Sequence, residues 1–140
     1  MPWFTAMGEE AGKPLVFRCR RILPDGAEQQ DCPHRVSIYW PYTQSNENGM
    51  PDEETNQNQV RFEAALDDLL THVDAYLMLV VTGNSRKEWH WYTRDVEVWV
   101  NEANKRLVDM PPFPITIENT EEPDWSLYNN FLAGVRGLES

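Results

Sequence analysis

The chain has 140 residues, 41% of them hydrophobic, and a net charge of −11 at pH 7. This length predicts one domain, 1–140, and the hydrophobic content is too high for a disordered chain. With 12 basic and 23 acidic residues, the protein is expected to repel nucleic acid and anionic membranes and to attract basic partners.

The sequence favours a reducing compartment. The longest apolar run, Ala75–Val81, is too short to cross a bilayer. Residues 1–11 have no basic start and no apolar stretch, which argues against secretion and predicts a cytoplasmic protein. Two cysteines, Cys19 and Cys32, do not form a disulfide framework. We expect two thiols in a cytoplasmic protein, and a bridge between them stays open as an alternative.

The first half of the chain begins with strand patterns and continues into a helix. Trp3–Met7 and Leu15–Arg20 are predicted to pair as a hairpin across Gly8–Pro14, and His34–Trp40 alternates as a strand does. A polar loop then leads to a helix that Asp52 is expected to cap. The buried stripe of this helix follows three- and four-residue steps through Phe62, Leu66, Leu69, Leu70 and Val73.

The second half alternates between strands and helices. Ala75–Thr82 is almost wholly apolar, which is typical of a central strand covered on both faces. In the strand Glu88–Thr93, alternate residues from Trp89 onward share one face. The remaining predicted elements are a helix over Asp95–Met110 capped by Asp95, a strand over Phe113–Ile117 and a short helix over Asp124–Leu132.

This order of elements predicts the fold class. Strand, helix, strand, strand, helix, strand is the α+β, ferredoxin-like (βαββαβ) arrangement, in which two helices lie on one face of an antiparallel sheet. The N-terminal β-hairpin is expected to extend the sheet. The short C-terminal helix is expected to cover exposed sheet.

Three segments together resemble a known family. They are the segments from Asn48 to Glu54, from Val81 to Thr93, and from Ile115 to Tyr128. The chain resembles, over nearly its whole length, a bacterial family known as domain of unknown function 695 (DUF695). The resemblance implies an α+β fold and no established chemistry. Some members of that family are joined to a domain similar to a ribonuclease E inhibitor, which favours an inhibitory binding role.

The sequence contains no convincing catalytic or metal-binding pattern. Cys32 and His34 are the one close pair of metal ligands, whereas zinc sites usually show two such pairs. Cys19 lies inside an apolar strand, where thiols are usually inert. There is no nucleophile elbow and no phosphate-binding loop. We therefore expect no metal, no cofactor and no enzyme activity, with a small enzyme that has its pocket between sheet and C-terminal helix as the alternative.

The aromatic pair Trp89 and Trp91 allows two interpretations. On a sheet of this topology such a pair can stack nucleic-acid bases. Nucleic-acid binders need a basic footprint, however, and the one local cluster is Arg18, Arg20 and Arg21. We therefore expect both tryptophans to be core residues and the protein to bind no nucleic acid.

The densest patch of one charge lies between residues 47 and 74, where eight acids accompany one base, Arg61. Such a patch can steer association with a basic surface. The sequence therefore predicts a non-catalytic binding protein that inhibits a basic protein partner such as a toxin or nuclease, with no membrane and no small-molecule ligand. A solvated helix that only keeps the protein soluble is the alternative. The predicted binding residues are Glu47, Asp52, Glu53, Glu54, Glu63, Asp67, Asp68 and Asp74.

Overall fold

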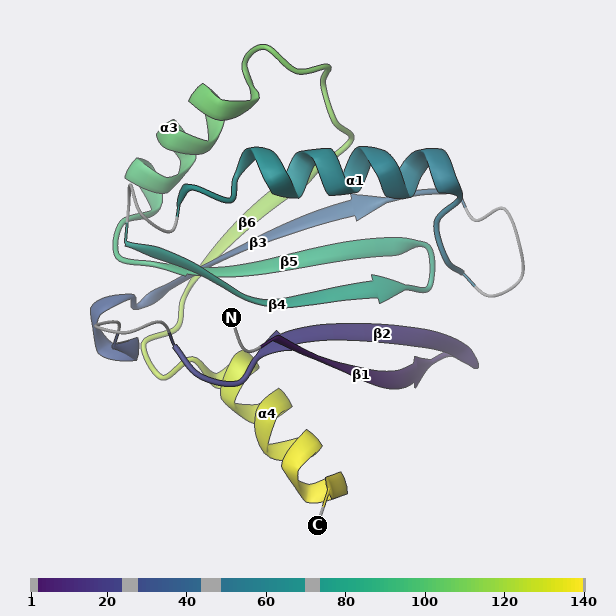
Figure 1. Ribbon diagram of the computed structural model, residues 1–140. Helices are drawn as coiled ribbons and strands as arrows, with labels where there is room; N and C mark the ends of the chain where they lie inside the picture. Colours follow the sequence, from purple (N-terminus) through teal and green to yellow (C-terminus); the bar gives the residue numbers. More distant parts are fainter. Residues whose placement is uncertain (1–2, 24–27, 44–48, 70–73, 140) are drawn as a thin grey trace.

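The computed structural model describes residues 3–23, 28–43, 49–69 and 74–139. In these ranges the protein is a mixed α+β structure with a six-stranded antiparallel open sheet and three α-helices (Figure 1). The elements in chain order are β1 (Trp3–Glu10), β2 (Lys13–Arg20), the 3₁₀ helix η1 (Gln29–Asp31), β3 (His34–Pro41), α1 (Glu53–Ala65), β4 (Ala75–Gly83), β5 (Arg86–Thr93), α3 (Val96–Leu107), β6 (Thr116–Glu121) and α4 (Ser126–Glu139).

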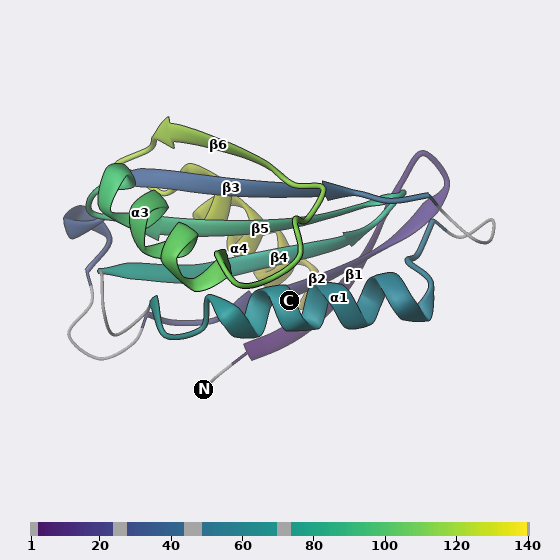
Figure 2. The same cartoon turned by 90° about the horizontal axis from the view of Figure 1, so that it is seen from above.

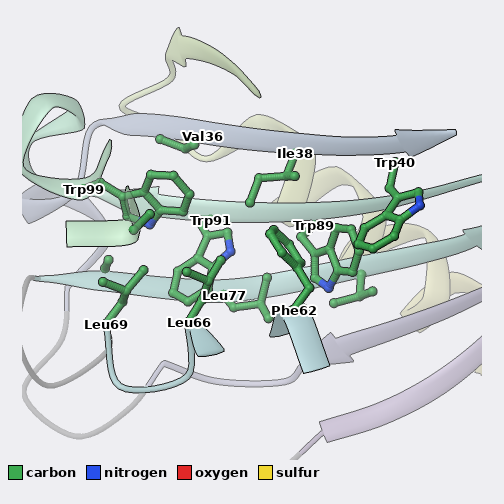
Figure 3. Packing of buried hydrophobic residues seen from close by; sticks show 13 residues of the cluster. Val36, Ile38, Trp40, Phe62, Leu66, Leu69, Leu77, Trp89, Trp91 and Trp99 are labelled. Carbon is green, nitrogen blue, oxygen red and sulfur yellow. The ribbon is translucent and has the colours of Figure 1, made fainter. Parts of the chain in front are cut away.

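The sheet separates two hydrophobic clusters. Its strand order is β1-β2-β4-β5-β3-β6, so β1 and β6 are its edges. Helices α1 and α3 cover one face, and α4 lies against the other (Figures 1 and 2). The cluster under α1 and α3 includes Trp40, Phe62, Leu69 and Trp99 (Figure 3). The cluster under α4 is centred on Tyr92, Trp125, Tyr128 and Leu132.

Strand β5 shows why the sheet can be covered on both sides. Trp89 and Trp91 point into the cluster under α1 and α3, whereas Tyr92 belongs to the cluster under α4. This alternation is the one predicted from the sequence, and both tryptophans are core residues, as expected. The neighbouring strand β4 lies between β2 and β5 and is buried along most of its length.

Both predicted helix caps are confirmed. The Asp52 side chain accepts a hydrogen bond from the amide of Thr55, and Asp95 does the same for Val98. The helix ends differ from prediction. Helix α1 ends at Ala65, and a turn then carries Leu69 into the core, while Leu70 and Val73 lie outside the described residues. Helix α3 was predicted to end at Met110 and ends at Leu107. The C-terminal helix was predicted over 124–132, whereas α4 covers Ser126–Glu139 and is longer.

The last strand begins later than predicted. Instead of Phe113–Ile117, β6 covers Thr116–Glu121 and pairs with β3. Proline has no amide donor for a sheet ladder, so the prolines up to Pro114 delay the pairing. Phe113 and Ile115 instead pack against the cluster under α1 and α3.

The N-terminal hairpin is confirmed, but its turn is tighter than the predicted Gly8–Pro14 loop. Residues Ala11 and Gly12 alone connect β1 and β2, with φ angles of 53° and 79°. Two consecutive positive φ angles identify a two-residue type I′ turn, whose twist matches that of the strands. Glu10 and Lys13 therefore face each other directly beside the turn. This fixes which residues of β1 pair with β2 and which face outward.

Candidate functional site

The predicted acidic residues gather on and around α1, but they do not act alike. Glu47 lies outside the described residues. Asp52 is engaged as the cap of α1, and this hydrogen bonding lowers its pKa. Glu53 and Glu54 lie exposed in the first turn, where negative charge suits the positive end of the helix dipole.

Three of the predicted acids are held in ion pairs within the chain. Glu63 turns inward, where it accepts hydrogen bonds from the Arg18 guanidinium and from the indole Nε1 of Trp89. Asp68 pairs with Arg106 of α3, and Asp74 pairs with Arg94 at 3.1 Å. These three carboxylates therefore tie α1 and its flanking turns to the rest of the fold.

The acidic surface that stays exposed consists of two separate ends. One end is Asp52, Glu53 and Glu54; the other is Asp67, next to the paired Asp68. The 13 helical residues of α1 span about 20 Å at 1.5 Å per residue, and Asp67 follows in the next turn. The surface between the two ends is uncharged or basic and includes Asn56, Gln57, Val60, Arg61 and Ala64, with Val60 57% exposed. We call these two ends and the surface between them the α1 face.

A small polar cavity of about 240 Å³ lies beneath the C-terminal end of α1. Arg18 and Arg20 line it together with Glu63 and Asp67. Both guanidiniums lie over the Trp3 ring, at 5.0 and 4.5 Å from its centroid. Burial lowers the pKa of Arg20, and the charge of Asp67 acts in the opposite direction. Of the three arginines predicted as a basic footprint, Arg18 and Arg20 are thus engaged with Trp3 and with acids of this cavity, whereas Arg21 is exposed.

A chain of polar side chains crosses the sheet on the α4 side. His90 Nδ1 lies 2.8 Å from Ser37 Oγ, and its Nε2 lies 3.0 Å from Glu88 Oε1. Arg86 links Glu88 to Glu10. Its Nε lies 2.6 Å from Glu88 Oε2, and its Nη2 lies 2.9 Å from Glu10 Oε2. Burial raises the pKa of Glu88, but the hydrogen bonds from His90 and Arg86 outweigh it and hold this pKa below its ordinary value.

The Ser37, His90 and Glu88 contacts contain the groups of a nucleophilic catalytic triad. Their burial gives them a different role, since Ser37 is 2% and His90 4% exposed, so a substrate has no access to the hydroxyl. We interpret them as a structural network that satisfies buried polar groups. The sequence did not predict this group, because residues on β3 and β5 meet only through the strand register that sets Ser37 opposite His90.

The two thiols are buried in surroundings that disfavour the thiolate. Cys19 and Cys32 are both free cysteines, and each thiol donates to a backbone carbonyl. Burial raises the pKa of Cys19 to about 12 and that of Cys32 to about 11. A thiol is nucleophilic and binds metals as the thiolate, which these values suppress at neutral pH. Within the described ranges no group of three or more His, Cys, Asp or Glu side chains is placed to hold a metal ion.

An apolar groove of about 680 Å³ lies where the β1–β2 hairpin faces α4. Its walls include Phe4 and Phe17 from the hairpin and Phe131 from α4. The ring centroids of Phe17 and Phe131 are 4.8 Å apart. Arg21 is the one charged residue in the described lining, and its guanidinium lies over the Phe4 ring. This groove runs beside five consecutive residues of β1, from Phe4 to Gly8.

Comparison with known proteins identifies a family for this chain but no function. None of the helices in the described part of the chain combines the length and apolar character needed to cross a membrane. No curated protein and no solved structure matches the chain. The model of one family, described as a family of unknown function (DUF695), matches residues 2–133. The chain therefore belongs to this family of unknown function, DUF695.

Proposed function

We propose that this chain is a non-catalytic binding protein that uses the α1 face to bind, and inhibit, a basic protein such as a toxin or nuclease. The observation that carries the proposal is which charged side chains form ion pairs within the chain and which do not. Six basic side chains of the described residues form ion pairs with acids of the same chain, namely Arg18, Arg35, Arg86, Arg94, Lys105 and Arg106. The exposed acids Glu53, Glu54 and Asp67 have no ion-pair partner among the described residues.

The geometry of the α1 face suits recognition more than it suits stability. Charged groups at an interface mainly set the association rate and the specificity, because they steer two partners before contact. The two acidic ends of α1 are about 20 Å apart, which is a distance within the width of an ordinary protein interface. The exposed Val60 and its amide neighbours lie between them and supply surface for direct contact.

Two further proposals accompany this one. We infer that β4, β5, β3 and β6, with α1 and α3 on one face, form a ferredoxin-like unit to which the hairpin is added; the strand order and the shared face of the helices support it. We also infer a cytoplasmic location. Two buried free cysteines support it, because proteins of oxidising compartments usually pair their cysteines.

The test compares two matched triple variants as bait. Glu53→Gln, Glu54→Gln and Asp67→Asn remove three charges from the α1 face; Glu97→Gln, Asp109→Asn and Glu118→Gln remove three exposed charges elsewhere. A basic protein captured by the wild type from a lysate of the producing organism is identified by mass and purified. We expect the first triple to slow its association, measured by surface plasmon resonance at two salt concentrations, and to weaken the salt dependence.

The second triple is expected to change association little, since it alters the net charge equally and leaves the α1 face intact. Both triples should melt within a few degrees of the wild type, because exposed acids contribute little to stability. Asp68 is left unchanged because it pairs with Arg106 of α3 and so contributes to the packing of α1 and α3. Equal effects of the two triples, or no effect of either, would reject the α1 face as the interface.

The groove beside α4 supports one alternative function, a small-molecule site. Its volume lies within the range typical of ligand pockets, and its position is the one expected for an enzyme pocket between sheet and C-terminal helix. The described lining contains no carboxylate, histidine or cysteine, so binding is favoured over catalysis. A small apolar compound that raises the melting temperature, combined with no captured protein, would replace the protein-binding proposal with this one.

A further inference from the structure

The two edges of the sheet are protected differently. Natural proteins guard exposed edge strands with charges, prolines or short length, since a bare edge pairs with other chains. Strand β6 has six residues, including Glu118 and Glu121. Strand β1 has eight residues, and from Trp3 to Gly8 it contains neither a charge nor a proline. Met7, near the middle of this edge, is 65% exposed.

The type I′ turn determines which backbone groups of β1 face outward. In a two-residue hairpin the residues beside the turn exchange hydrogen bonds, so Glu10 pairs with Lys13 in this way. Hydrogen-bonded and non-hydrogen-bonded pairs then alternate along an antiparallel ladder. The amides and carbonyls that point away from β2 are therefore those of Trp3, Thr5, Met7 and Glu9. In the described part of the chain β1 pairs with β2 alone.

We propose that a second copy of this chain pairs antiparallel with β1 along this edge, around a two-fold axis at Ala6. This register uses all four outward-facing residues, because Trp3 lies opposite Glu9 and Thr5 lies opposite Met7. A two-fold interface of this kind is closed, so it yields a dimer and not a fibre. The two sheets become one continuous sheet, and neither copy keeps its bare edge.

Charge complementarity selects a second copy as the occupant. The side chains of Trp3, Met7 and Glu9 occupy alternate positions of β1 and therefore point to the sheet face that carries α1. The guanidiniums of Arg18 and Arg20 lie over Trp3 on that face. The proposed register places Glu9 of the second copy directly opposite Trp3, beside these two arginines. Glu9 is exposed and makes no ion pair with any described residue of its own chain.

The opposite face is complementary in shape and polarity. Phe4, Ala6 and Gly8 point toward α4 and form part of the apolar groove. In the proposed register Phe4 lies opposite Gly8 of the second copy, and the two Ala6 residues face each other. The apolar floors of the two grooves therefore become continuous across the axis. This burial of apolar surface favours association, and the arginine–glutamate contacts fix the register.

Cross-linking tests the register directly. A non-hydrogen-bonded antiparallel pair has Cα atoms about 4.5 Å apart, which lies within the range that a disulfide bridges. Ala6→Cys is therefore expected to give a covalent dimer on mild oxidation, seen by non-reducing electrophoresis. Thr5→Cys is the control, since the two Cα atoms at position 5 would lie about 8 Å apart, too far for a disulfide. Cys19 and Cys32 are buried and do not interfere.

Sedimentation equilibrium tests the affinity. Glu9→Lys should raise the dissociation constant of the dimer on the order of tenfold or more, because the two-fold axis places the lost contact at two equivalent positions. Glu118→Lys makes the same charge change on β6 and should have no effect. Thr5→Pro removes an outward amide that β2 does not use and should abolish dimerisation. A wild type that stays monomeric, or a dimer that neither Glu9→Lys nor Thr5→Pro weakens, would overturn the proposal.

Discussion

Single carboxylates in this protein differ sharply in what they do, although the sequence presents them as one acidic population. Glu63 receives two donors beneath α1, and Glu122 accepts the Tyr92 hydroxyl and pairs with Arg35. Glu10 bridges the hairpin to β5 through Arg86. These buried or bridging acids hold elements together, and others such as Glu54 remain available to partners.

Glu10 gives a prediction about acid stability. Hydrogen bonds from Arg86 and Asn84 lower the pKa of Glu10 from 4.5 to about 2. A carboxyl group with a lowered pKa in the folded state stabilises the fold above its unfolded pKa, and this contribution is lost as the pH falls toward the folded value. The stability difference between wild type and Glu10→Gln should therefore be largest above pH 4.5 and shrink toward pH 2.

Urea titrations of both proteins at several pH values would measure this difference. Glu118→Gln is the matched control, because its side chain is exposed on β6 and makes no ion pair within the described chain. A difference for Glu10→Gln that does not change between pH 6 and pH 2 would show that the Arg86 contact does not form in solution.

Helices α1 and α3 are held to the sheet by a few large side chains. Leu69 and Trp99 are fully buried in the cluster beneath them (Figure 3). Leu69→Ala should cost about 2–5 kcal/mol and Trp99→Ala about 3–5 kcal/mol of unfolding free energy, since both leave cavities. Val108→Ala, at a residue 74% exposed, serves as control. Urea denaturation measures all three, and losses of under about 0.5 kcal/mol at both buried sites would contradict this packing.

The order and type of the elements could be read from hydrophobic periodicity, and the helix starts from Asp52 and Asp95. The positions of turns could not. Ala11 adopts a positive φ angle, which alanine rarely does, so no residue type at that position indicated a two-residue turn. The beginning of β6 was misplaced because the apolar residues Phe113 and Ile115 suggest a strand before the prolines allow one.

At the scale of the whole molecule, the excess of acids is presented outward. The net charge is −11. Six basic side chains of the described residues form ion pairs within the chain, while exposed carboxylates such as Glu53 and Glu54 have no such partner there. The acidic residues of the candidate site could be identified from the sequence as a group. Their division into bridging and exposed members could not, since it depends on partners such as Arg18 and Arg106 that are distant in the sequence.

This charge predicts no affinity for nucleic acid. Binding to DNA or RNA depends on neutralising phosphates with basic side chains, and here the two arginines that lie over the Trp3 ring, Arg18 and Arg20, flank a cavity that also contains two acids. Fluorescence anisotropy with labelled oligonucleotides at physiological salt should show no binding. Tight, salt-sensitive binding would contradict the prediction and would require another basic surface.

Because the sheet divides the core, tryptophan fluorescence can report on each of its two sides. Trp40, Trp89, Trp91 and Trp99 lie on one side, whereas Trp125 lies on the other, stacked on Tyr92 at 4.0 Å. Indole emission shifts to longer wavelength when water reaches the ring. Trp125→Phe would leave an emission spectrum dominated by the side beneath α1 and α3, and its difference from the wild-type spectrum would isolate the side beneath α4. Loosening of either face could then be followed separately by light, with no dye attached.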